Sequence, residues 1–225
     1  MSRICSRRVF LRELLAAGLQ RGTLSSISAG TSRRDCSDLR RYFMKLLMHI
    51  CCSNCSVYPL QSLLLEGIDV RGFWFNPNIH PYTEYTARRG SLMALEKLWN
   101  IDIAYEDDYA LDAFLTSIAG RGAERCTVCY RMRLDRTARE AKRMQLDGFT
   151  TSLLASPYQK FDVIQSLGRK TAKRHGIAFH AADFRTGWKT SQGLVRELGL
   201  YRQKYCGCIY SEMERYAPGN KTKGT

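Results

Sequence analysis

The sequence contains no run of 18 apolar residues, so it predicts no transmembrane helix. Acidic residues are few. The chain has 21 Asp and Glu and 35 Lys and Arg, which gives a net charge of +14. The nine cysteines are too sparse among 225 residues for a small disulfide-stapled scaffold. Apolar residues at 44% and charged residues at 25% exclude global disorder and a coiled coil. A balance this basic favours a polyanionic partner, with nucleic acid as the first candidate.

The positive charge is unevenly distributed along the chain. Residues 1–43 hold nine Arg, no Lys and three acidic residues, so they contribute +6, and residues 44–225 carry +8. An Arg-rich, acid-poor leader is typical of an organelle transit peptide. The alternative is a disordered extension from an upstream start site, because Met44 opens an apolar run (MKLLMHI) that suits a first core strand. We therefore expect one domain over residues 44–212 and a basic tail over residues 213–225.

From Met44 onward, strand and helix patterns alternate with short connections. Predicted strands cover Lys45–Ile50, Asp69–Phe75, Ile101–Tyr105, Gly148–Leu154 and Ile177–Ala181. Predicted helices cover Ser56–Gly67, Tyr82–Trp99, Tyr109–Ala119, Cys126–Leu146, Lys160–His175 and Thr190–Leu198. This order predicts an α/β fold of the Rossmann-like type, with a mostly parallel sheet and helices on both faces. The ligand crevice of such a sheet lies beyond the carboxyl ends of its strands.

Seven of the nine cysteines fall into three tight groups, and the other two, Cys5 and Cys36, are isolated. The first group directly follows the first predicted strand, the second opens a predicted helix, and the third follows the last one. Because each group lies at an element boundary, all three can converge on one site. The groups are Cys51, Cys52 and Cys55, then Cys126 and Cys129, then Cys206 and Cys208.

Four interpretations of these cysteines compete. Buried small apolar side chains explain a single cysteine but not seven in CC-x-x-C, C-x-x-C and C-x-C patterns. Structural zinc takes four ligands, three fewer than are present. A [4Fe–4S] cluster takes four thiolates and leaves three for a second metal or for redox chemistry. A thiol–disulfide relay of redox-active cysteines is the remaining alternative. Ligand number and softness favour iron–sulfur chemistry.

Other motifs carry weaker signals. The segment from Phe75 to Pro81 (FNPNIHP) and the segment from Ser152 to Gln159 each end a predicted strand, on the side where a ligand binds. Tyr201–Tyr205 mixes aromatic and cationic residues, as RNA-binding surfaces do. A basic stretch also surrounds the second cysteine group and suggests an anionic substrate; its members are Arg121, Arg125, Arg131, Arg133, Arg136, Arg139, Lys142 and Arg143.

Together, the motifs HICCSNC, ERCTVCYRMRL, TSLLASPYQ, DFR and QKYCGCIYS resemble the QueH-type epoxyqueuosine reductases, in the order and spacing of that family. The resemblance runs from Met44 to about Tyr210. Where the family has Ala-Pro after the cysteine pair, this chain has Ser53-Asn54, at positions that are not ligands. The resemblance implies a Rossmann-like fold related to the PP-loop (HUP) nucleotide-binding type. The CC-x-x-C group occupies the place of an SGGxDS-like phosphate loop, so ATP use is not implied.

The resemblance also implies an activity, which is the last step of queuosine biosynthesis in tRNA. The enzyme would be a cytoplasmic oxidoreductase that reduces epoxyqueuosine to queuosine at the wobble position of a GUN-type anticodon. The family needs no cobalamin and uses a [4Fe–4S] cluster with an adjacent mononuclear iron. The ligands would come from Cys51, Cys52, Cys55, Cys126, Cys129, Cys206 and Cys208, in a partition that the sequence leaves open. We expect an external one-electron donor of the ferredoxin or flavodoxin type, and no membrane partner.

Removal of the epoxide oxygen consumes two electrons and two protons, so the site needs proton donors within hydrogen-bond reach of that oxygen. The candidates are Tyr205, His49 and Asp183. An unpaired anticodon base could stack on Tyr158, Tyr201 or Tyr205. Two other classes remain open. One is a PP-loop-like tRNA-modifying sulfurtransferase, against which the missing phosphate loop argues, and the other is a zinc-stabilised RNA-binding module.

Overall fold

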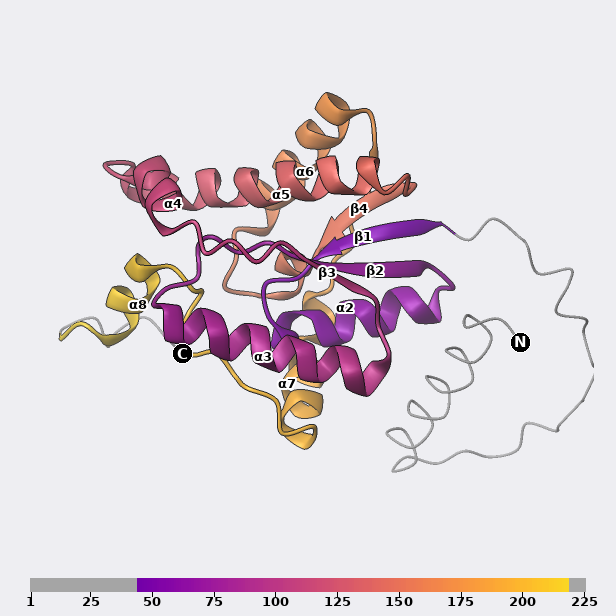
Figure 1. The fold of residues 1–225 in the computed structure, drawn as a ribbon, viewed down its shortest axis with the longest axis horizontal. Coiled ribbons are helices and arrows are strands. Elements are labelled where there is room, and N and C mark those ends of the chain that lie inside the picture. Colours follow the sequence, from indigo (N-terminus) through magenta and orange to yellow (C-terminus); the bar gives the residue numbers. More distant parts are fainter. Residues whose placement is uncertain (1–43, 219–225) are drawn as a thin grey trace, which may run out of the picture. The chain divides into compact units, whose positions relative to one another are not determined.

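A computed structural model describes residues 44–218, and these form a five-stranded parallel sheet between two layers of helices (Figure 1). The predictions for residues 1–43 and for the end of the tail fall outside the described residues. The strands are β1 (Lys45–His49), β2 (Asp69–Trp74), β3 (Ile103–Tyr105), β4 (Gly148–Thr151) and β5 (Ala178–Phe179). The helices are α2 (Ser53–Leu65), α3 (Tyr82–Trp99), α4 (Leu111–Ile118), α5 (Arg125–Arg143), α6 (Phe161–His175), α7 (Trp188–Glu197) and α8 (Ile209–Tyr216).

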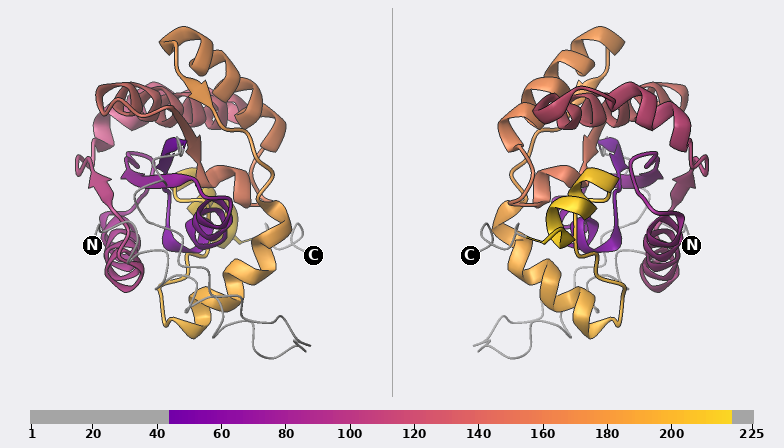
Figure 2. Two further views of the ribbon diagram at one scale, coloured as in Figure 1. Left: turned by 90° about the vertical axis from the view of Figure 1, so that its right-hand side faces the viewer. Right: turned by 90° about the vertical axis from the view of Figure 1, so that its left-hand side faces the viewer.

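Both faces of the sheet are covered by helices, which explains the continuous apolar run of its central strand, β1. In β1, Leu46, Leu47 and Met48 are fully buried. Helices α5 and α6 pack on one face, whereas α2 and α3 lie on the other, with α7 against α2 (Figure 2). Strands buried on both faces read as continuous apolar runs rather than alternating ones. The predicted fold class is therefore confirmed.

The strand order β3-β2-β1-β4-β5 places the site. The first strand, β1, lies at the centre of the sheet, and β2 and β3 follow outward on one side of it. The chain then crosses back along α5 and adds β4 on the other side of β1. His49, the last residue of β1, pairs with Phe73 of β2 and with Thr151 of β4. The order thus reverses between β1 and β4, and a doubly wound sheet opens its ligand crevice at the carboxyl end of such a reversal. The first cysteine group follows β1 directly at this point.

Several element boundaries differ from the predicted ones for local reasons. Strand β4 stops at Thr151, because the Thr151 side chain accepts a hydrogen bond from Leu153 N and turns Ser152–Ala155 into a 3₁₀ turn. Helix α2 begins at Ser53 rather than Ser56, because the Cys52 side chain caps it. The sequence patterns do not predict α8, which crosses the expected boundary between the domain and the tail at residue 212.

Helix α8 is held by contacts near the second cysteine group. Tyr210 packs against the buried cluster formed by Phe114, Ile118 and Cys129. Arg125 at the start of α5 forms an ion pair with Glu214 and lies over the Tyr210 ring. The chain beyond residue 208 therefore folds back over the region between α4 and α5. Within residues 44–218, no helix is both long and apolar enough to cross a membrane.

Gly168 gives a test of the packing between α6 and β5. A Cβ atom added to Gly168 would lie 2.2 Å from the Phe179 ring, far inside van der Waals contact. We expect Gly168→Ala to lower the free energy of unfolding by about 1–3 kcal/mol, because the helix must move away from the sheet. Chemical denaturation measures this loss.

Gly90 provides the matched control, because it lies within helix α3 and an added Cβ would meet no atom within 4 Å. Gly90→Ala should raise the free energy of unfolding by up to about 1 kcal/mol through helix propensity alone. Equal stability changes in the two variants would contradict the close contact at Gly168.

Candidate metal centre

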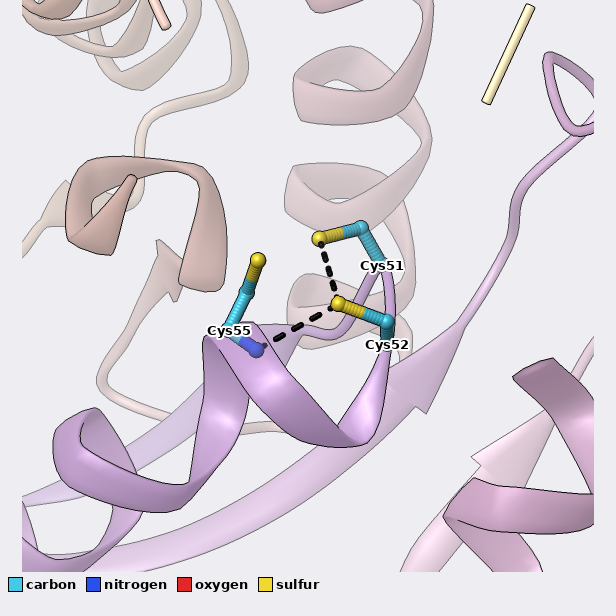
Figure 3. Close-up of side chains that lie close together, drawn as sticks. All are labelled: Cys51, Cys52 and Cys55. Carbon is cyan, nitrogen blue, oxygen red and sulfur yellow. Dashed lines mark hydrogen bonds between the residues drawn. The ribbon is translucent and has the colours of Figure 1, made fainter. Parts of the chain in front are cut away.

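The first three cysteines form a compact sulfur cluster at the carboxyl end of β1 (Figure 3). Cys51, Cys52 and Cys55 are all buried, and their Sγ atoms lie within 4.8 Å of one another. The Sγ atoms of Cys51 and Cys52 are 3.8 Å apart. Cys52 is the N-cap of α2, and its Sγ accepts a hydrogen bond from Cys55 N at 3.3 Å. The cap fixes the first turn of the helix, so Cys55 lies beside the adjacent pair.

Hydrogen bonding prepares this cluster to bind a cation. Thiol hydrogen bonds from Cys52 and Cys55 hold the pKa of Cys51 well below its usual range. Burial raises the pKa of Cys52, and its hydrogen bond to Cys51 adds to this rise. The first proton lost therefore leaves a thiolate on Cys51. Cysteine binds metal as thiolate, so a bound ion would displace the remaining protons.

Two polar side chains from other elements also donate to these sulfur atoms. Ser152, directly after β4, accepts a hydrogen bond from Cys51 N at 3.1 Å and donates to Cys51 Sγ at 3.4 Å. Gln203 Nε2 donates to Cys52 Sγ at 3.0 Å and to Cys55 Sγ at 3.5 Å. Donors of this kind stabilise thiolate and orient metal ligands.

The other four cysteines line a single cavity between α4, α5 and the segment that precedes α8. Cys126 and Cys129 face it from the first turns of α5, and Cys206 and Cys208 face it from the other side. Phe114 and Ile118 form its apolar wall. Burial raises the pKa of Cys129 to about 12, so its thiol ionises readily only beside a positive charge. The predicted convergence of the second and third groups is thus present.

The two sulfur sets differ in spacing. Among residues 44–218, only the first set brings three ligand atoms within 4.8 Å of one another. A metal–thiolate bond of about 2.3 Å allows two sulfur ligands on one ion to be at most about 4.6 Å apart. The Sγ atoms of Cys51 and Cys52, 3.8 Å apart, lie well inside this limit, so the first set suits a single ion. The cavity set is spread more widely, which suits a group made of several atoms.

Buried polar contacts attach the third cysteine group to the rest of the site. Arg88 of α3 donates from Nη1 to Cys206 O at 2.9 Å and from Nη2 to Tyr205 O at 2.8 Å. His80 N donates to Gly207 O at 2.7 Å. Gly207 has a φ of +137°, a left-handed value that disfavours other residues. The FNPNIHP segment therefore serves as the docking edge for the C-X-C loop.

The three proposed proton donors have different surroundings. His49 is fully buried, with Nδ1 3.0 Å from Thr151 Oγ1 and Nε2 3.2 Å from the Phe75 carbonyl oxygen, so both ring nitrogens are occupied. Asp183 forms an exposed ion pair with Arg185, whose hydrogen bonds lower the pKa of the carboxyl group. It is therefore ionised at neutral pH. His49 thus has both ring nitrogens paired within the protein, and Asp183 lies at the surface beside Arg185.

Tyr205 keeps its proton. Burial raises the pKa of its hydroxyl, which donates to the His80 carbonyl oxygen at 2.5 Å. Tyr130, which the sequence does not single out, lines the four-cysteine cavity itself. Its hydroxyl donates to Gln159 Oε1 at 2.8 Å, and Gln159 Nε2 donates to Cys206 Sγ at 3.3 Å. The position of Tyr130 four residues after Cys126 on α5 is the sequence signal that points to it.

Comparisons with known proteins cover the part of the chain that carries this site. A family model described as "Epoxyqueuosine reductase QueH" matches residues 46–214. The curated protein of that name from Dehalococcoides mccartyi is 35% identical over 176 residues, which cover 78% of this chain and 97% of the relative. The one from Thermotoga maritima is 33% identical over 180 residues, which cover 76% and 91%. The matched region contains all seven grouped cysteines.

His49 gives a test of the site's internal structure. Burial lowers its pKa from 6.5 to about 4, so the unfolded chain takes up a proton below pH 6.5 while the folded chain does not. Stability from this group is complete above pH 6.5 and falls by up to about 3 kcal/mol as the pH drops towards 4. Denaturant titrations of chelator-treated protein across this range measure the loss. His49→Gln should show a shallower slope, and an unchanged slope would contradict the assignment.

Proposed function

The chain belongs to the QueH family of epoxyqueuosine reductases, and from this premise we propose that its seven grouped cysteines hold the metals with which it reduces epoxyqueuosine to queuosine in tRNA. The observation that carries the proposal is the grouping of these cysteines in space, with three sulfur atoms within 4.8 Å of one another at the carboxyl end of β1 and the other four cysteines around one cavity. In the reaction, the epoxide accepts two electrons and two protons, its oxygen leaves as water, and an alkene remains. The enzyme is an oxidoreductase of tRNA queuosine biosynthesis.

The spacing of the sulfur atoms supports a partition between two metal groups. Cys126, Cys129, Cys206 and Cys208, around one cavity, match the four thiolates of a [4Fe–4S] cluster. Cys51, Cys52 and Cys55 match a single iron with one open position. The donor set fits, because thiolates are the ligands that iron–sulfur chemistry prefers. When bound, these groups would supply electrons singly and a Lewis acid for the epoxide oxygen.

The protein's own residues would hold ligands and deliver protons. Ser152 and Gln203 would keep their hydrogen bonds to the three thiolates of the first set. Tyr205 and Tyr130 both remain protonated at neutral pH, so each suits the role of proton donor. Tyr130 is favoured by its place in the cavity wall, and Tyr205 by its place next to Cys206.

The tRNA would approach the carboxyl end of the sheet. Tyr158 has an 82% exposed side chain and neighbours Gln159, which contacts Cys206, so it suits a stacking role for an unpaired base. Tyr201 is less suited, because its hydroxyl is engaged by Glu84. We further propose that the substrate carries a GUN-type anticodon and that a ferredoxin or flavodoxin type of donor supplies the electrons. ATP is not used, and the reaction takes place in the cytoplasm, where thiols stay reduced.

Serine variants of single cysteines test the partition. Cys206→Ser should lose the visible absorption of the iron–sulfur cluster, because serine replaces one of its four thiolates. Cys52→Ser should keep that absorption and lose about one iron per chain, because only the single-ion site is disrupted. Both should abolish conversion of epoxyqueuosine-tRNA. Iron analysis and absorption spectra of anaerobically purified protein provide the measurement.

Cys36→Ser is the matched control, because this cysteine lies outside the three groups in the sequence. Its iron content and activity should equal those of the parent. Loss of visible absorption in Cys52→Ser but not in Cys206→Ser would contradict the partition. Colourless parent protein with stoichiometric zinc would instead indicate an RNA-binding module.

Expression in a bacterial strain that lacks its own epoxyqueuosine reductase tests the activity. The strain accumulates epoxyqueuosine in tRNA, and expression of this chain should convert it to queuosine, measured by mass spectrometry of tRNA nucleosides. The Cys126→Ser variant at equal expression is the control and should leave epoxyqueuosine in place. Persistence of epoxyqueuosine with the parent chain would defeat the proposal. Formation of a thiolated nucleoside with ATP dependence would indicate a sulfurtransferase.

A further inference from the structure

Arg133 is a buried cation within the metal site. It lies on α5, one turn after Cys129, and its side chain is only 1% exposed. Its Nη2 donates to Cys129 Sγ at 3.1 Å, and its Nε donates to Cys129 O at 3.2 Å. The side chain also forms part of the cavity wall that the four cysteines line. Its charge is therefore directed at the sulfur ligands.

The charge of Arg133 has no carboxylate partner among residues 44–218. None of the ion pairs found there includes it. Arg88 is equally buried, but its Nε lies 2.7 Å from Glu84 Oε1. An unpaired buried cation is strongly unfavourable, so some other negative charge must balance Arg133.

The available negative charge belongs to the cysteines of the cavity. Cys129, whose Sγ accepts the hydrogen bond from Arg133 Nη2, lines this cavity together with Cys126, Cys206 and Cys208. A metal group bound by these four cysteines would hold them as thiolates. Arg133 is thus placed to act on the cavity set.

We propose that Arg133 is a positioning residue that balances the charge of the metal-bound thiolates of the cavity set and raises the reduction potential of the iron–sulfur group. The inference rests on the proposed function, because it needs a metal-loaded site. Each electron that enters such a group adds negative charge next to the guanidinium. A nearby cation that hydrogen-bonds a sulfur ligand stabilises the reduced state more than the oxidised state. Removal of the cation should therefore make reduction harder.

The test compares Arg133→Met, which keeps much of the volume but removes the charge, with Arg133→Lys, which keeps the charge. In metal-loaded protein, Arg133→Met should shift the midpoint potential to more negative values, as measured by a redox titration followed by electron paramagnetic resonance. Arg133→Lys should return most of that shift. Arg139→Met is the matched control, because Arg139 lies on the same helix but is exposed. It should leave the potential unchanged.

The metal-free protein gives a second readout that a merely structural arginine would not produce. In the metal-free chain, burial raises the pKa of Cys129 and Cys206 and keeps both thiols protonated, so Arg133 has no charged sulfur partner in the cavity. Arg133→Met should therefore not lower the thermal midpoint of the metal-free chain. The same substitution should speed the loss of iron from the loaded protein. Opposite responses of the two forms support the proposal.

Two results would overturn it. One is an unchanged midpoint potential in Arg133→Met at full iron content. The other is a thermal midpoint that falls equally in the metal-free and metal-loaded forms, because this indicates a packing role alone. Failure of the proposed function itself looks different, since the parent protein would then bind no iron–sulfur group and show no potential to shift.

Discussion

The parallel pairing of β1 with β2 on one side and β4 on the other is the constraint on which the rest of the structure depends. It brings the residues after β1 and after β4 side by side, so that Cys51 meets Ser152, about a hundred positions further along the chain. Because the strands pair in register, Cys51 and Ser152 come within hydrogen-bond distance of each other. The three cysteines after β1 have their geometry because the strand ends and helix α2 begins within four residues.

The negative charge of the thiolates is the second constraint on the site. Four of the seven grouped cysteines, Cys51, Cys52, Cys55 and Cys129, are buried, and the thiols would become negative once metals replaced their protons. Cations and hydrogen-bond donors of the protein, rather than water, would compensate this negative charge. Arg133 and Arg88 are almost fully buried nearby, and Ser152, Gln159 and Gln203 direct hydrogen bonds at sulfur.

Much of this architecture could be predicted from the sequence because its signals are local. Apolar runs identified β1 and β2, periodicity placed α3 at Tyr82–Trp99, and cysteine spacing defined the three groups. What the sequence could not reveal depends on contacts between distant segments. The pairing of Gln203 with Cys52, the burial of Arg133 and the folding back of α8 onto α4 arise only from packing. The surroundings of His49 also could not be predicted, because the partners of its two ring nitrogens, Thr151 and Phe75, come from segments far away in the sequence.

The cavity that Cys126, Cys129, Cys206 and Cys208 share also has a consequence for how the protein is made. The two pairs are separated along the chain by β4, α6, β5 and α7, so a group bound to both would close a very long loop. Closing a long loop costs entropy that only pre-existing structure can reduce. During synthesis, Cys206 and Cys208 leave the ribosome after all five strands. By then the sheet can already hold α5, with Cys126 and Cys129, in place. Metal insertion would then be the final stage of assembly, and the C-terminal C-X-C loop would supply the last two ligands and hold the bound group in place.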